Sequence, residues 1–200
     1  MDGRRNGYRA AGNGRRTPMP VKIVIAGGFG VGKTTAVSAI SEIPVLTTEV
    51  AMTEVAAAID RGGLVPDKTT TTVALDFGRL TLDDDIMLYL FGTPGQDRFG
   101  FMWTELTEGA IGALVIVDTR RLDDCYPAVD FFERAGLPFV VGVNLFDGLL
   151  RHEMDDVRWA LAVADDTPVI SLDARERLSV RDALVAVLQC ALSSRPTRGR

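Results

Sequence analysis

Residues 21–34 read Val21-Lys22-Ile23-Val24-Ile25-Ala26-Gly27-Gly28-Phe29-Gly30-Val31-Gly32-Lys33-Thr34, and this stretch decides the fold of the 200-residue chain. Its first six residues form an apolar run, and the next eight match the phosphate-loop pattern G-x-x-x-x-G-K-[ST] without a gap. Glycines let a backbone curl around an anion, so that its N–H groups and the N-terminus of the next helix converge on phosphates. The stretch therefore predicts a site for a nucleoside triphosphate.

The loop and the start of the following helix supply the predicted phosphate contacts, which are Gly27, Gly30, Val31, Gly32, Lys33, Thr34 and Thr35. Lys33 reaches the outer phosphates in such a loop and is also a candidate catalytic residue, while the Thr34 hydroxyl is a candidate Mg²⁺ ligand. The alternative is a Gly-rich turn with a chance Lys-Thr pair. A strand before the loop and helix-forming residues after it count against that alternative.

Alternating strand and helix patterns follow along the chain and predict an α/β fold. We expect a three-layer P-loop NTPase domain with a mostly parallel six-stranded sheet, one antiparallel edge strand and helices on both faces. The expected strands are 21–26, 73–82, 86–91, 111–117, 138–143 and 167–171. The longest irregular region is 41–71, within which a short helix over Val50 to Ile59 is possible. Connections of that length in a compact domain are usually functional.

Composition predicts a single domain over residues 20–193, between disordered basic tails at 1–19 and 194–200. The tails at 1–20 and 195–200 hold eight of the 22 basic residues and one of the 27 acidic ones, so the part between them carries a net charge of −12. Such a charge argues against binding nucleic acid. No signal peptide or membrane span is expected, so we predict a cytoplasmic protein that reaches a membrane only through a partner. The single histidine, His152, excludes histidine-based catalytic triads and most zinc sites.

Four further motifs, which follow the phosphate loop along the chain, make residues 20–192 resemble the Ras-like small GTPases, specifically the bacterial branch that includes the gliding-motility MglA proteins and the actinobacterial conservon GTPases. Gly92-Thr93-Pro94-Gly95-Gln96 resembles the second switch. The resemblance implies that the Gly95 N–H binds the γ-phosphate and that Gln96 is catalytic, orienting the attacking water. Thr72, in Thr72-Val73-Ala74-Leu75-Asp76-Phe77, would be the metal ligand of the first switch, although Thr70 or Thr71 could serve instead.

Gly92 stands where this family usually has an aspartate that supports Mg²⁺. MglA-like proteins lack it too. Either metal binding is weaker in this chain or another carboxylate takes over.

Base selection is implied for two segments, Asn144-Leu145-Phe146-Asp147 and Ser171-Leu172-Asp173-Ala174-Arg175. Asp147 can accept two hydrogen bonds from guanine that adenine cannot supply. The resemblance directs the Ala174 N–H to guanine O6. The full set of predicted base contacts is Asn144, Leu145, Asp147, Asp173, Ala174 and Arg175. Leu145 replaces the usual lysine, which leaves an apolar lid over the base.

Phe29 stands where related eukaryotic GTPases usually have glycine. Its ring either obstructs Gln96 and slows hydrolysis, or only packs over the ribose or the switch. From all of this we expect a GTP-binding, slowly hydrolysing molecular switch that uses GTP/GDP and Mg²⁺. The alternatives are a nucleotide-binding adaptor with negligible turnover and, with less support, an ATP-binding P-loop protein. The resemblance implies a roadblock/LC7-type regulator and a sensor-kinase-like membrane protein as partners, and we expect no nucleic acid and no direct membrane insertion.

Overall fold

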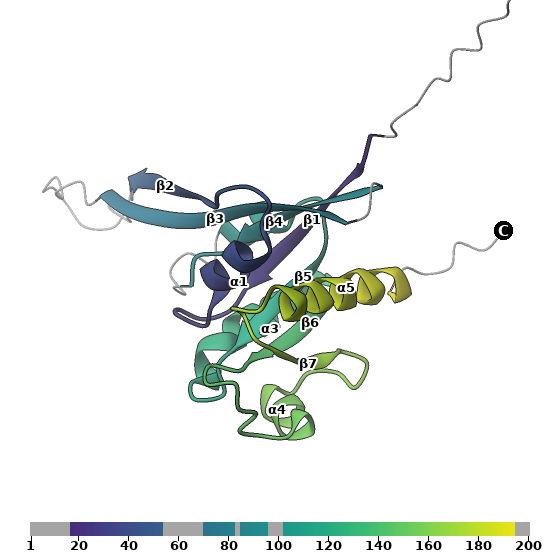
Figure 1. Cartoon of the computed structure of the whole chain (residues 1–200). Coiled ribbons are helices and arrows are strands. Elements are labelled where there is room, and N and C mark those ends of the chain that lie inside the picture. The colour runs from purple at the N-terminus through teal and green to yellow at the C-terminus, as the bar shows by residue number, and fades with distance from the viewer. Residues whose placement is uncertain (1–16, 54–69, 83–84, 96–101, 195–200) are drawn as a thin grey trace, which may run out of the picture.

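One seven-stranded sheet organises the chain, in the order β2-β3-β4-β1-β5-β6-β7 (Figure 1). The structure is a computed structural model that describes residues 17–53, 70–82, 85–95 and 102–194. From β4 to β7 all neighbouring strands are parallel, whereas β2 and β3 pair antiparallel with each other and β3 pairs antiparallel with β4. The strands are β1 (Met19–Ala26), β2 (Leu46–Thr53), β3 (Thr70–Leu82), β4 (Ile86–Gly92), β5 (Ala110–Val117), β6 (Phe139–Asn144) and β7 (Val169–Leu172).

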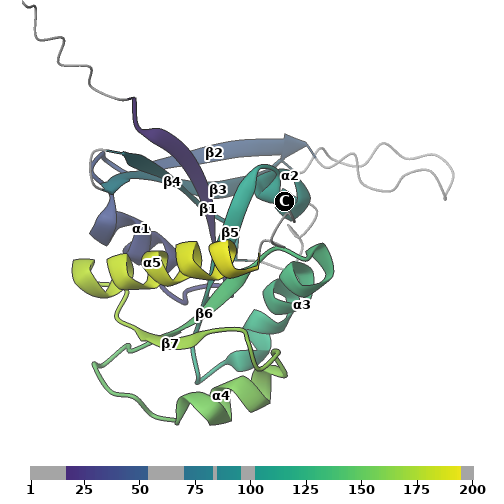
Figure 2. The ribbon, with the colours of Figure 1, turned by 90° about the vertical axis from the view of Figure 1, so that its right-hand side faces the viewer.

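Helices cover both faces of the sheet (Figure 2). In this view α1 and α5 lie on one side, α2 and α3 lie on the other, and α4 lies beyond the β7 edge. The helices are α1 (Lys33–Ile40), α2 (Trp103–Thr107), α3 (Tyr126–Ala135), α4 (Met154–Leu161) and α5 (Arg177–Ser193), with a short 3-10 turn, η2 (Leu122–Cys125), before α3. This confirms the predicted α/β class with helices on both faces.

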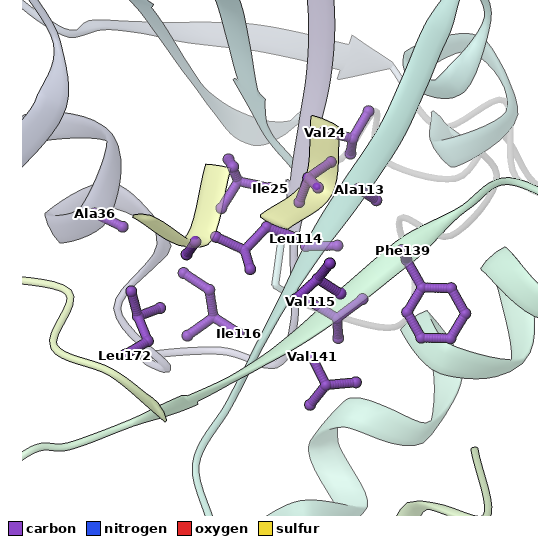
Figure 3. Packing of buried hydrophobic residues seen from close by; sticks show 14 of the residues in the cluster. Val24, Ile25, Ala36, Ala113, Leu114, Val115, Ile116, Phe139, Val141 and Leu172 are labelled. Atoms are coloured by element: carbon purple, nitrogen blue, oxygen red, sulfur yellow. The ribbon is translucent and has the colours of Figure 1, made fainter. Parts of the chain in front are cut away.

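The core lies where the central parallel strands meet α1 and α5 (Figure 3). Leu114, Val115 and Ile116 of β5 are fully buried, as expected for a strand with helices on both sides. Apolar side chains of α5 face this core, where Val180 and Leu184 are buried. Gly136 ends α3 at φ 61°, in the left-handed region that favours glycine.

Two expectations about the sheet edge were wrong. The sheet has seven strands rather than six, and the additional strand, β2, takes the edge position beside β3. The possible helix over 50–59 is wrong for residues 50–53, which belong to β2, and its remainder lies outside the described residues. A strand forms here because the outer edge of β3 would otherwise expose a row of unpaired backbone groups, and the β-branched residues of 46–53 suit a strand.

Within the described residues, no helix has both the length and the apolar character needed to cross a bilayer.

Candidate nucleotide-binding site

The predicted phosphate loop lies between the end of β1 at Ala26 and the start of α1 at Lys33. Two of its glycines are required by close approach as well as by backbone angle. Gly27 has φ 132°, and a Cβ there would lie 2.1 Å from the carbonyl oxygen of Ile116. Gly32 has φ 108°, and a Cβ there would lie 2.7 Å from Nδ2 of Asn144. The loop therefore curves tightly at these two positions, where only glycine fits, as the motif predicted.

Lys33 is a buried cation at the mouth of this loop. Its Nζ donates hydrogen bonds to the carbonyl oxygens of Gly27, at 2.8 Å, and Gly28, at 2.6 Å. Burial lowers the pKa of Lys33 to about 8, while the nearby Cys125 and Asp76 act in the opposite direction. A cation held with so little solvent is stabilised by a bound anion, as a phosphate site requires.

Asp76 is the carboxylate that the sequence left unidentified. It lies on β3 directly opposite Gly92 of β4, and it is buried. A Cβ on Gly92 would lie 3.0 Å from the Cβ of Asp76, so the Asp76 side chain fills the space that an aspartate at position 92 would need. The Thr34 hydroxyl donates a hydrogen bond to Oδ2 of Asp76. A carboxylate from the neighbouring strand thus stands beside the predicted metal ligand.

An open cavity of about 360 Å³ joins these groups. Its lining comes from the phosphate loop, the start of α1, β2, β3 and the segment after β4, namely Phe29, Gly30, Gly32, Lys33, Thr34, Thr35, Thr47, Asp76, Thr93, Pro94 and Gly95. Gly95 lies against the loop, because a Cβ there would lie 2.7 Å from Lys33 Nζ and 2.8 Å from Phe29 Cα. The structure thus brings the predicted second-switch glycine to the phosphate loop.

Phe29 is 65% exposed at the rim of this cavity. Its backbone is held from outside, because Nη2 of Arg121 donates a hydrogen bond of 2.7 Å to the Phe29 carbonyl oxygen. The other side of the Arg121 guanidinium pairs with Asp124 at 3.4 Å. The exposed ring thus lines the cavity rim, and Arg121 contacts the main chain of the same residue.

Asn144 connects the three segments predicted to bind phosphate and base. Its Nδ2 donates to the Val31 carbonyl oxygen at 2.8 Å, and its Oδ1 accepts from the Ala174 N–H at 3.1 Å. The predicted base loops are therefore adjacent in space. The Ala174 N–H, expected to reach guanine O6, is engaged by Asn144 in this structure.

The predicted base-reading carboxylate is exposed and surrounded by arginines. Asp147 pairs with Arg151 at 2.9 Å, and Asp173 pairs with Arg175 at 2.8 Å. The Arg120 guanidinium lies 4.2 Å from the centre of the Phe146 ring.

The same Arg120 binds both oxygens of the buried Asp118 and lowers the pKa of that carboxyl. Leu145 and Phe146 join Asp118, Arg120, Leu149 and Arg151 in lining a small hollow at this end of the sheet.

Sequence reasoning missed Asp76, Thr47, Arg120 and Arg151 as site residues. Asp76 did carry a signal, because it stands in the predicted first-switch strand. The structure does not describe the side chains of two predicted site residues. Gln96 lies outside the described residues, and Thr72 is described only by its backbone, which pairs with Ala51 of β2.

Fold and site together define a nucleotide-binding P-loop domain, and solved structures of G domains share its fold. The chain matches the G domain of the T. maritima FeoB iron transporter with a TM-score of 0.57 and 13% identity, over 88% of this chain and 99% of that one. It matches the FeoB G domain of Methanococcus jannaschii with a TM-score of 0.56 and 14% identity, over 87% of this chain and 98% of that domain. A GDP-bound S. thermophilus NFeoB variant matches with a TM-score of 0.60 and 17% identity, over 88% of this chain and 63% of the longer NFeoB chain.

The chain belongs to the family described as "Conserved hypothetical ATP binding protein", whose model matches residues 25–194. It is also similar to the uncharacterized protein MJ1339 of Methanocaldococcus jannaschii, with 32% identity over 129 residues, which is 64% of this chain and 71% of that protein. The solved structures share too little sequence to show more than the fold. The MglA-like and conservon branch stays a prediction from the sequence motifs.

Proposed function

We propose that this chain binds GTP and GDP and acts as a slow GTP-hydrolysing switch of the MglA-like and conservon kind. The observation that carries the choice of base is Asp147, which follows β6 beside Asn144, the residue that joins the base loops to the phosphate loop. A carboxylate accepts hydrogen bonds from guanine N1–H and its exocyclic amine, and adenine offers no such pair of donors. The alternative is an ATP-binding P-loop protein, in keeping with the description of the family to which the chain belongs.

Magnesium fits the residues around Thr34. The cavity offers the Thr34 hydroxyl and the buried Asp76 carboxylate. It also contains the buried Thr93 hydroxyl, which has no hydrogen-bond partner among the described residues. Mg²⁺ is commonly held by one or two protein oxygens together with water and phosphate oxygens. Thr34 and Asp76 would hold the ion, which when bound neutralises charge on the phosphate oxygens.

The proposed rate of hydrolysis is low. Phe29 lines the cavity next to Gly95, where the attacking water and Gln96 would have to meet the γ-phosphate. A ring at this position competes with them for space. We expect turnover at or below about 10⁻⁴ to 10⁻³ per second, the range of an unassisted site of this class. An adaptor with negligible turnover remains the second candidate function, and the same exposed ring favours it.

Partners are proposed from the resemblance alone. A roadblock/LC7-type regulator and a sensor-kinase-like membrane protein would respond to the nucleotide state, and the second would recruit the chain to a membrane. The segments next to the γ-phosphate side of the cavity are the ones whose contacts differ between GTP and GDP, so they would carry the signal.

Two measurements test the proposal. Chromatography of the nucleotide released when freshly purified protein is denatured should give GDP or GTP. Single-turnover hydrolysis of GTP in Mg²⁺ should then proceed slowly and stop in Lys33→Ala. Released ADP or ATP would favour the ATP-binding rival, and bound GTP that never turns over would favour the adaptor.

A further inference from the structure

Thr47 reaches the proposed metal site from β2, the edge strand that the sequence did not predict. It is opposite Asp76 in the antiparallel ladder, so the two side chains lie on the same face of the sheet. The Thr47 hydroxyl donates a hydrogen bond of 3.2 Å to Oδ1 of Asp76, while the Thr34 hydroxyl donates to Oδ2. Each oxygen of the carboxylate therefore accepts a hydrogen bond from a different element, Oδ1 from β2 and Oδ2 from α1.

The ladder also fixes how far the predicted first-switch threonine lies from this carboxylate. Thr72 is four residues before Asp76 on the same strand and pairs with Ala51. At about 3.4 Å per residue its backbone lies roughly 13 Å along the strand from that of Asp76. The strand hydroxyl that contacts the carboxylate in this structure is that of Thr47.

The hydrogen bond between Thr47 and Asp76 joins an exposed side chain on the edge strand to a buried carboxylate. Asp76 is buried, whereas Thr47 is exposed on the outermost strand of the sheet while also lining the nucleotide cavity. An edge strand carries unpaired backbone groups on its outer side, and a partner strand can dock there. A movement of β2 that separated Thr47 from Asp76 would remove this hydrogen bond from the carboxylate.

We propose that Thr47 is a positioning residue for the Asp76 carboxylate, through which edge strand β2 sets the Mg²⁺ affinity of the nucleotide site. The hydrogen bond to Oδ1 fixes the rotation of the carboxylate and leaves Oδ2 directed at the Thr34 side, where the metal is proposed. This inference rests on the proposed function, because it assumes a Mg²⁺-dependent nucleotide site.

The test measures how the release rate of a fluorescent GDP analogue falls as Mg²⁺ is added. The midpoint is the Mg²⁺ concentration at which half of this fall has occurred. Thr47→Val removes the hydroxyl at constant shape and should raise this midpoint about three- to tenfold, the value of one hydrogen bond to a charged group on a part-exposed side chain. Thr47→Ser keeps the hydroxyl and should restore the wild-type midpoint. In excess EDTA the release rates of all these proteins should coincide, because the hydroxyl acts only through the metal carboxylate.

Thr81→Val is the matched control. Thr81 also donates a hydroxyl hydrogen bond from a strand of this sheet to a carboxylate, at 3.0 Å to Glu42, but it does not line the nucleotide cavity. Its midpoint should equal that of the wild type. Asp76→Asn should raise the midpoint more than Thr47→Val does, and adding Thr47→Val to Asp76→Asn should change nothing further.

Each contrary outcome overturns a different statement. A Thr47→Val midpoint equal to that of Thr81→Val, with Asp76→Asn still shifted, refutes the role of Thr47 and leaves the proposed function standing. A Thr47→Val effect that persists in EDTA refutes it as well, since the change would then act through the fold. An unshifted Asp76→Asn overturns both the metal assignment and the role of Thr47. If the wild type does not bind the GDP analogue, the proposed function itself fails.

Discussion

Replacing Asn144 with alanine should destabilise the protein more than any substitution on its surface. The side chain is 9% exposed and makes two hydrogen bonds, one to the Val31 carbonyl oxygen and one from the Ala174 N–H. Val31 and Ala174 are themselves almost fully buried, at 0% and 1% exposed. Water therefore cannot replace the lost partner at either backbone group.

The size of the effect follows from those two groups. Leaving one buried donor or acceptor without a partner costs about 1–3 kcal/mol, so the loss of both partners in Asn144→Ala should lower the free energy of unfolding by about 2–6 kcal/mol. That is a large fraction of the roughly 5–15 kcal/mol that stabilises a typical domain. For a domain of this size the melting temperature should fall by about 4–24 °C.

Urea unfolding of nucleotide-free protein, followed by circular dichroism, measures this loss. Arg151→Ala is the control, because it removes an exposed ion pair with Asp147 and should cost at most about 1 kcal/mol. If the unfolding free energy of Asn144→Ala lies within about 0.5 kcal/mol of that of the control, the central bridging role of Asn144 is refuted.

Three further outcomes are expected. Lys33→Ala should lose nucleotide binding in calorimetry while its circular dichroism spectrum is retained, because the phosphate oxygens lose their buried cation; unchanged affinity would remove the phosphate-loop assignment. Phe29→Gly should hydrolyse GTP faster than the wild type in single-turnover assays, and Gln96→Leu in that background should cancel the gain; no acceleration would mean that the ring only packs. Gly92→Asp should weaken the Mg²⁺-dependent retention of GDP, because the new Cβ would lie 3.0 Å from the Cβ of Asp76. Combining Gly92→Asp with Asp76→Gly should restore retention, because the carboxylate then moves from position 76 to position 92. A double variant that retains GDP as weakly as Gly92→Asp alone would contradict the idea that one carboxylate position substitutes for the other.

The phosphate loop could be predicted from the sequence because its chemistry is local. Gly27, Lys33 and Thr34 lie within eight consecutive residues, and a strand before them and a helix after them suffice to place them. The order of the later motifs likewise placed Asn144 and Ala174 near the loop. Parallel strands bring their carboxyl ends to one edge of the sheet, so residues that follow them gather there.

The role of Asp76 as the carboxylate beside the proposed metal site could not be predicted from a local sequence motif. Asp76 joins the site only because β3 and β4 pair in the register that sets it opposite Gly92, and Thr47 joins only because β2 pairs with β3. Register depends on contacts between segments that are distant in sequence. The strand β2 itself was missed because Thr47, Thr48 and Glu49 are three consecutive polar residues and leave no clear apolar period. It is held by pairing with β3 rather than by a pattern of its own.

The preference for guanine is the central claim, and competition calorimetry with Asp147→Asn tests it most directly. The wild type should bind GDP at least about a hundredfold more tightly than ADP, because a site built to hydrogen-bond a group rejects the analogue that lacks it. Asp147→Asn should lose affinity for GDP and gain affinity for xanthosine diphosphate, whose C2 oxygen accepts the new amide donor. Asp182→Asn, which also changes an exposed carboxylate paired with an arginine but lies outside the predicted base contacts, should retain the preference for GDP. Equal or tighter binding of ADP by the wild type, or an unchanged GDP preference in Asp147→Asn, would contradict the account.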